Sequence, residues 1–161
     1  MTYTRSLYLA GALLGSAFAQ TATAQTATTS FGVTITIEDA CVIVSATDLN
    51  FGTVGTLTDN VDAYSNIAVT CTEGAAYDIA LDAGLGGGTS SSRVMTSAGN
   101  TIGYQLYQDA DRTTVWGDTA DVLSETGTGS EQSYFVYGRV PPQKTPPAAT
   151  YTDTVGVTVT F

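Results

Sequence analysis

Two stretches of the chain, residues 30–37 and residues 154–161, alternate between apolar residues and small or polar ones. A period of two with β-branched and aromatic residues at the apolar positions is typical of a strand buried on one face. The apolar positions are Phe31, Val33, Ile35 and Ile37 in the first stretch and Val155, Val157, Val159 and Phe161 in the second. Both stretches are therefore predicted to be strands, and a strand near a chain end can complete its own sheet or be donated to another molecule.

Between these two stretches the chain keeps a rhythm of short apolar runs and Gly, Asn or Asp turns, without a convincing helical period. Strands are expected within residues 41–51, 63–72, 76–81, 93–96, 101–107, 113–116 and 133–140. The Gly- and Ser-rich residues 84–92 are predicted to be a loop, and all four prolines fall within residues 141–147, which we expect to be a stiff exposed connection. The pattern predicts an all-β fold, an antiparallel sandwich of about eight strands.

Residues 1–19 have the layout of a secretory signal peptide. Arg5 supplies the positive charge, residues 7–18 are mostly apolar, and small residues precede the expected cleavage after residue 19. A second box of small residues would place cleavage after residue 24. The apolar run is shorter than the roughly 20 residues that span a membrane, and the remaining alternative is an amphipathic or buried helix. We therefore expect an exported chain without a membrane span.

The composition is acidic, with 15 Asp and Glu residues against 5 Lys and Arg residues and a net charge of −10. The basic residues beyond the leader are Arg93, Arg112, Arg139 and Lys144, which we interpret as surface charges. Such a surface repels nucleic acid and anionic lipid, so no nucleic-acid partner is expected.

Cys41 and Cys71 make an even count of cysteines in a chain expected to be exported, which predicts a disulfide. Closing this loop of roughly 31 residues would contribute about 3–4 kcal/mol in the chain-entropy description. The alternatives are a metal pair or a nucleophilic thiol. Metal ligation would favour His or further Cys, and the chain contains no His.

No catalytic constellation is evident in the sequence, so the chain is not expected to be an enzyme or to bind a cofactor. Lys144, the single lysine, lies in the proline segment. Asp109 and Asp111 with Asp118 bear a faint likeness to a calcium loop, but Thr114 stands where that loop requires Gly. No metal site is predicted.

Seven segments, in order along the chain, carry a resemblance to a known family. They are residues 41–52 (Cys-Val-Ile-Val-Ser-Ala-Thr-Asp-Leu-Asn-Phe-Gly), 69–72 (Val-Thr-Cys-Thr), 104–109 (Tyr-Gln-Leu-Tyr-Gln-Asp), 115–117 (Val-Trp-Gly), 127–129 (Gly-Thr-Gly), 137–140 (Tyr-Gly-Arg-Val) and 151–155 (Tyr-Thr-Asp-Thr-Val). Together they resemble the spore coat protein U domain, which is found in subunits of archaic, Csu-type chaperone-usher pili.

The resemblance implies that residues 41–161 form an incomplete immunoglobulin-like antiparallel β-sandwich, completed by donor strand exchange. Residues 25–40 would be the donor segment, with Phe31, Val33, Ile35 and Ile37 as the donor side chains. The acceptor groove would include Val155, Val157, Val159 and Phe161. The implied partners are a periplasmic chaperone, an outer-membrane usher and neighbouring pilin subunits.

Two functions of different classes follow. The first is a structural pilus subunit, exported through the periplasm to the cell surface and serving attachment and biofilm formation. The second is a self-complete secreted spore-coat or cell-surface binding protein, in which residues 30–37 pair within their own domain. A tip adhesin is a weaker third alternative.

Overall fold

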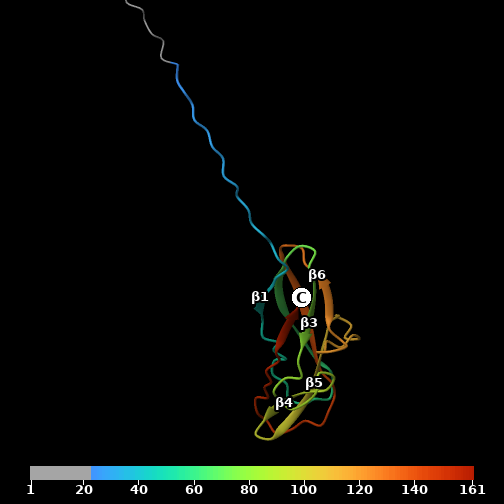
Figure 1. The fold of residues 1–161 in the computed structure, drawn as a ribbon. Coiled ribbons are helices and arrows are strands. Elements are labelled where there is room, and N and C mark those ends of the chain that lie inside the picture. Colours follow the sequence, from blue (N-terminus) through green and yellow to red (C-terminus); the bar gives the residue numbers. More distant parts are fainter. Residues whose placement is uncertain (1–22) are drawn as a thin grey trace, which may run out of the picture. The chain divides into compact units, whose positions relative to one another are not determined.

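The computed structural model describes residues 23–161, and the leader predicted at residues 1–19 lies outside them. The described residues contain strands and no helix (Figure 1). The strands are β1 (Cys41–Ala46), β2 (Val61–Cys71), β3 (Ala76–Leu81), β4 (Arg93–Ser97), β5 (Asn100–Tyr107), β6 (Leu123–Thr126), β7 (Glu131–Val140) and β8 (Val157–Thr160). The chain divides after Ile35, and every strand belongs to the unit that begins at Thr36.

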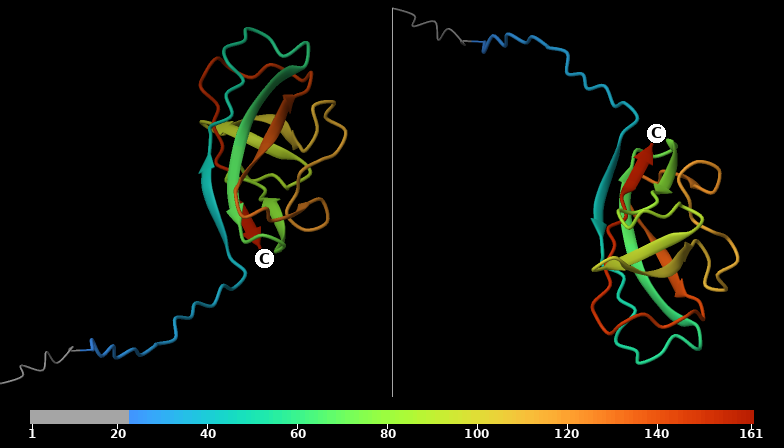
Figure 2. Two further views of the ribbon diagram at one scale, coloured as in Figure 1. Left: turned by 90° about the horizontal axis from the view of Figure 1, so that it is seen from above. Right: turned by 90° about the horizontal axis from the view of Figure 1, so that it is seen from below.

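The strands form two antiparallel sheets, which Figure 2 shows from two sides. One sheet has five strands in the order β1-β2-β7-β5-β4, and the other has three in the order β6-β3-β8. The long strands β2 and β7 pair from Val61 opposite Val140 to Thr70 opposite Glu131. Both lie in the interior of the larger sheet, with a strand on each side. Strands that are far apart in sequence are thus neighbours, as β3 and β8 also are.

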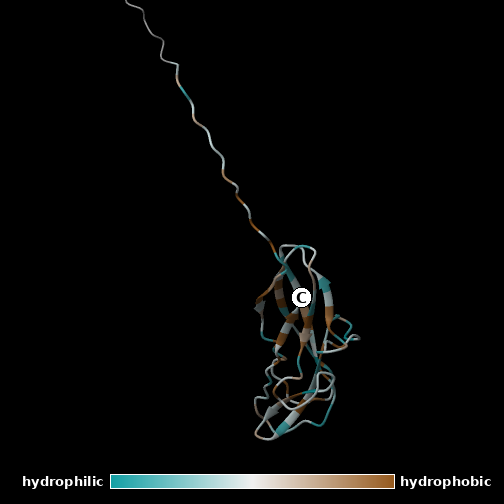
Figure 3. Cartoon of the chain, in the orientation of Figure 1, coloured by the Kyte–Doolittle hydropathy of each residue, from teal (hydrophilic) through white to brown (hydrophobic). Residues whose placement is uncertain are grey.

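The core lies between the sheets, because alternate residues along each strand face the same way. Side chains that are almost wholly buried include Val69 on β2 and Ile79 and Leu81 on β3. Figure 3 shows brown, apolar positions on several strands of the sandwich. Trp116 is also fully buried although it belongs to a loop, and its indole N–H donates to the carbonyl of Ile79 at 2.8 Å. The loop before β6 therefore contributes the largest side chain of the core.

The predicted disulfide is confirmed. Cys41 and Cys71 are joined with an S–S distance of 2.06 Å. They are also cross-strand partners in the register of β1 and β2, so the bond lies at the first residue of β1 and the last residue of β2.

Most of the strands expected between residues 41 and 140 are present, with two differences. Residues 113–116 are predicted to be a strand but form only one isolated bridge, from Val115 to Tyr107. The N–H groups of Thr113 and Thr114 donate to the carboxylate of Asp109 and are not available to a strand ladder. Strand β6 was not predicted, because its sequence Leu-Ser-Glu-Thr carries a single apolar residue. The loop expected at residues 84–92 is present.

Of the two stretches with alternating patterns, one contains a strand in the structure and the other does not. Residues 157–160 form β8, within the strand predicted at 154–161. Residues 30–37 form no strand, and their four apolar side chains are 70–88% exposed. The donor role of this segment stays a prediction.

Candidate functional site: an open groove between the sheets

Strand β1 is an edge strand of the larger sheet and β8 an edge strand of the smaller one, and the two approach each other. Each of them has a neighbouring strand on one side only, so main-chain N–H and C=O groups along the other side are unpaired with a strand. We call the space between these two free edges the groove.

The wall formed by β1 has an inward-facing side chain that is not covered. Ile43 stands directly opposite Val69, and directly opposed residues of an antiparallel pair point to the same face. Val69 is fully buried, whereas Ile43 is 39% exposed. An inward-facing isoleucine with this exposure indicates that a covering element is missing beside β1.

The wall formed by β8 has the same property. Val159 stands opposite Ile79, and Val157 stands opposite Leu81. The two partners on β3 are fully buried, but both valines are only half-buried although they pack against the core. The inward faces of β1 and β8 are thus incompletely covered on both sides of the groove.

A cleft of about 1080 Å³ adjoins one end of the groove, where Ala46 of β1 and Val157 of β8 are part of its lining. Its lining includes the core side chains Ile67, Leu106 and Val136 together with Val155 and Val157. Of the other residues predicted for the acceptor groove, Val159 packs against the core, and Phe161 is 59% exposed and lines a separate small hollow. The structure therefore brings Val155 and Val157 to the cleft and leaves Phe161 at the outer end of β8.

Much of the lining of the cleft comes from two irregular segments, which lie within residues 46–57 and 145–155. The N–H of Leu57 donates to Thr145 Oγ1 at 2.9 Å, and the N–H of Gln143 donates to the carbonyl of Leu57 at 2.9 Å. These bonds hold the proline-rich connection against the loop that follows β1. The stiff crossing expected from the prolines is therefore part of the border of the cleft.

Two carboxylates fix the backbone that leads into β8. Asp82 Oδ1 accepts the N–H groups of Gly84 and Gly156, each at 2.8 Å. Asp153 Oδ1 accepts the N–H of Gly86 at 2.8 Å, and its Oδ2 accepts the hydroxyl of Tyr104 at 2.6 Å. Burial, and then the bond to Asp153, raise the pKa of Tyr104, which therefore remains a neutral donor at neutral pH.

The glycine at position 84 is required by this arrangement. Its φ is +76°, a region that side chains with a Cβ rarely adopt, and a Cβ there would collide with the carboxylate of Asp153. The Gly-rich loop is therefore packed against the segment before β8.

Arg93 was expected to be a surface charge, and this expectation is wrong. It is fully buried, and its guanidinium group donates to five oxygen atoms at 2.6–2.9 Å. The acceptors are the carbonyls of Leu81, Asp82, Ser90 and Trp116 and the side chain of Gln105. Desolvation lowers the pKa of Arg93, but an arginine still keeps its charge at neutral pH.

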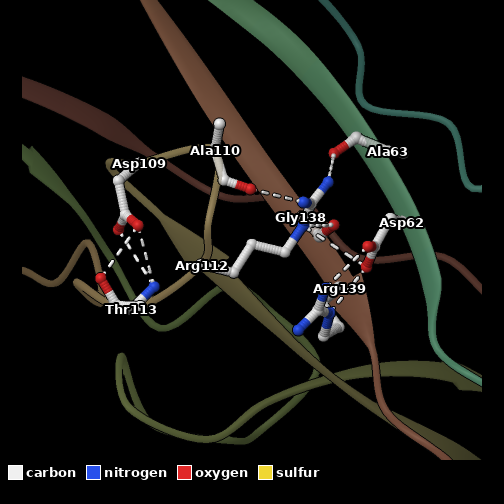
Figure 4. Close-up of polar contacts among 8 residues, drawn as sticks. All are labelled: Asp62, Ala63, Asp109, Ala110, Arg112, Thr113, Gly138 and Arg139. Carbon is white, nitrogen blue, oxygen red and sulfur yellow. Dashed lines mark hydrogen bonds and ion pairs between the residues drawn. The ribbon is translucent and has the colours of Figure 1, made fainter.

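A second polar cluster connects β2, β7 and the loop after β5 (Figure 4). Arg139 donates from Nε and Nη2 to the two carboxylate oxygens of Asp62, at 2.7 and 2.8 Å. Nε of Arg112 lies 3.4 Å from Asp62 Oδ1 and donates to the carbonyl of Gly138 at 3.1 Å. The hydrogen bond from Arg139 is the main cause that lowers the pKa of the Asp62 carboxyl group.

Asp109, one of the acidic residues with a faint likeness to a calcium loop, binds main-chain N–H groups of its own loop. The carboxylate of Asp109 accepts the N–H of Thr113 at 3.0 Å and the N–H of Thr114 at 2.6 Å, and these bonds lower its pKa. Within residues 23–161, no three His, Cys, Asp or Glu side chains are placed to hold a metal ion. The same residues include no helix of the length and hydrophobicity needed to cross a membrane.

The described unit is thus an all-β sandwich of antiparallel sheets in which the inward faces of two edge strands, β1 and β8, are incompletely covered. The sequence profile of the Spore Coat Protein U domain matches residues 27–158. The chain belongs to this family. It is also 36% identical over 142 residues to Protein U of Myxococcus xanthus, an alignment that covers 78% of this chain and 79% of that protein.

A solved structure shares the fold. It is the pre-assembly complex of the chaperone CsuC with the tip adhesion subunit CsuE, from the archaic chaperone-usher Csu pili of Acinetobacter baumannii. The match has a TM-score of 0.58 and 27% identity and covers 78% of this chain, which spans 40% of the matched chain. The expected family and the expected fold class, a β-sandwich of the chaperone-usher pilin type, are both confirmed.

Proposed function

We propose that this chain is a structural subunit of an archaic chaperone-usher fibre, in which residues 25–40 of one subunit occupy the groove of the next. The proposal rests above all on one observation. Ile43 and Val157 are partly exposed although their cross-strand partners, Val69 and Leu81, are fully buried. A strand inserted between β1 and β8 would cover both inward faces.

Residues 30–37 have the properties that such a strand needs. Four apolar side chains alternate with Gly32, Thr34 and Thr36, so one face could enter the groove while the other remains in water. Eight extended residues span about 26 Å, more than the roughly 20 Å of a six-residue strand such as β1. The segment is therefore long enough to pair along the whole free edge of β1.

The energetics indicate that both partners must contribute. Burying four donor side chains stabilises the complex by roughly 6–12 kcal/mol, and ordering eight residues costs roughly 8–16 kcal/mol of backbone entropy. The covering of groove residues such as Val157, and main-chain hydrogen bonds of about 0.5–1.5 kcal/mol each, would then decide the balance. Assembly on this scheme depends on the uncovered acceptor as much as on the donor.

The remaining steps of the proposal come from the family. We propose export with the leader at residues 1–19, or 1–24, folding on a periplasmic chaperone and polymerisation at an outer-membrane usher. The fibre would serve surface attachment and biofilm formation. The alternative function is a self-complete coat or surface protein in which residues 30–37 close their own groove.

A pair of neighbouring substitutions tests the proposal. Ile35→Asp places a charge where an apolar side chain would enter the groove, which costs several kcal/mol, whereas Thr34→Asp changes the opposite face. Unboiled surface material should show a ladder of SDS-resistant oligomers for the parent chain and for Thr34→Asp. Ile35→Asp should give monomeric or chaperone-bound protein. If Ile35→Asp instead unfolds the subunit while it is bound to its chaperone, the segment belongs to its own sandwich.

A further inference from the structure

The residues that join the donor segment to β1 are held by one residue, Thr72, through its main-chain N–H and its hydroxyl group. Thr72 directly follows β2, and its N–H donates to the carbonyl of Ala40 at 2.9 Å. Thr72 Oγ1 accepts the N–H of Ala40 at 3.1 Å and donates to the carbonyl of Glu38 at 3.2 Å. The first bond extends the β1–β2 ladder one step beyond the Cys41–Cys71 pair.

These contacts lie on one particular side of β1. One edge of β1 is paired with β2, and the other edge faces the groove. To fill its own groove, the segment at residues 30–37 would have to pair with the free edge of β1 as the first strand of a hairpin. Residues 38–40 would then be the hairpin loop and would have to turn away from β2. In the structure they are bonded to Thr72, on the β2 side.

The sequence of this connection also opposes a tight reversal. Three-residue hairpin loops commonly need a residue in the left-handed region, a position that Gly fills most easily. The connection reads Glu38-Asp39-Ala40 and contains no Gly. Both the bonding and the composition therefore favour a segment that continues away from β1.

We propose that Thr72 is a positioning residue that directs the N-terminal segment out of its own domain and so keeps the subunit from closing its own groove. This inference rests on the function proposed above. Thr72 would bias the choice between pairing within one chain and pairing between chains without contacting the groove itself. Loss of its hydroxyl group would let residues 38–40 turn, and self-closed monomers would accumulate.

The test uses the full-length exported chain with Thr72→Val, which keeps the shape of the side chain and removes the hydroxyl group. Thr72→Ser is the rescue variant, and Thr70→Val, two residues earlier, is the matched control. Hydrogen exchange of the amides of residues 31–37 is measured in the monomer fraction, and unboiled gels report the ladder. Thr72→Val should raise the ratio of closed to open monomer about three- to tenfold, as expected for one or two lost hydrogen bonds.

The supporting result is protection of residues 31–37 in Thr72→Val monomers, with a weaker ladder, while Thr72→Ser and Thr70→Val behave like the parent. Equal exchange in Thr72→Val and Thr70→Val would overturn the role of Thr72. If Thr72→Val does not fold, two glycines inserted after Asp39 relax the same connection, and unchanged exchange in that variant also overturns it. Absence of a ladder from the parent chain would refute the proposed function instead, and the exchange measurement still decides the role of Thr72.

Discussion

Removal of the buried guanidinium group should destabilise the sandwich strongly. Arg93→Met keeps most of the aliphatic length of the side chain but leaves five oxygen atoms without their donor. The bonds to Leu81, Gln105 and Trp116 are buried, so water does not readily replace the lost donor there. These three acceptors belong to β3, β5 and the loop with the core tryptophan, and all three elements should loosen together.

The magnitude follows from the number of buried acceptors that lose a donor, which are chiefly the carbonyls of Leu81 and Trp116, since Gln105 Oε1 still accepts the N–H of Leu106 at 2.7 Å. A buried polar group left without a partner costs about 1–3 kcal/mol, and part of that cost is relieved as the chain relaxes. We expect a loss of about 3–5 kcal/mol in the free energy of unfolding. For a domain of this size, this loss corresponds to a fall in Tm of roughly 10–20 °C.

Trp116 provides the assay, because it is the single tryptophan of the chain and is fully buried. Its fluorescence during urea unfolding reports the region that Arg93 holds. Arg139→Met is the matched control, since Arg139 is bonded to the partly exposed Asp62 and its loss should cost under about 1 kcal/mol. Equal unfolding midpoints for the two variants would refute the structural role assigned to Arg93.

Two further measurements concern the disulfide and the cluster around Asp62. Denatured, exported protein should contain no free thiol, and Cys41→Ser should lower stability by about 3–4 kcal/mol; titration of two thiols would contradict the bond. The arginine partners of Asp62 lower its pKa in the folded state. The ionised Asp62 therefore stabilises the fold above the unfolded pKa of about 3.9, and this stabilisation is lost as the pH falls through the folded pKa. The free energy of unfolding of Asp62→Asn should therefore be lower than that of the parent at neutral pH, by under about 1 kcal/mol. The two values should be equal at a pH below the folded pKa of Asp62, where the carboxyl group is protonated. A difference that persists unchanged at low pH would show that the charge is not the cause.

The sequence predicted those elements whose own residues carry the signal. The alternation in residues 154–161 located β8 and identified Val157 and Val159 as its inward face. By contrast, residues 113–116 have the composition of a strand, but the N–H groups of Thr113 and Thr114 are bonded to the carboxylate of Asp109. Strand β6 is polar and owes its conformation to pairing with β3, which no local pattern reveals.

The candidate site could be predicted only in part for a related reason. The wall at β8 has a local pattern, but the wall at β1 depends on the register that places Ile43 opposite Val69, and a bulge follows directly after Ile43. The environment of Arg93 is still less local, because its acceptors come from several segments brought together by the fold. A single arginine after a serine-rich loop carries no sign that such acceptors will surround it.

The disulfide between Cys41 and Cys71 has a mechanical consequence in a fibre built as proposed. Tension transmitted by the donor segment would enter the domain at residues 38–40, immediately before Cys41. The S–S bond would pass that load directly to the end of β2, the long strand paired with β7 at the centre of the larger sheet. The ladder between β1 and β2 would then not open one hydrogen bond at a time, because its first residue is covalently fixed. A pulled subunit would retain β1, and with it one wall of the groove that holds the neighbouring subunit.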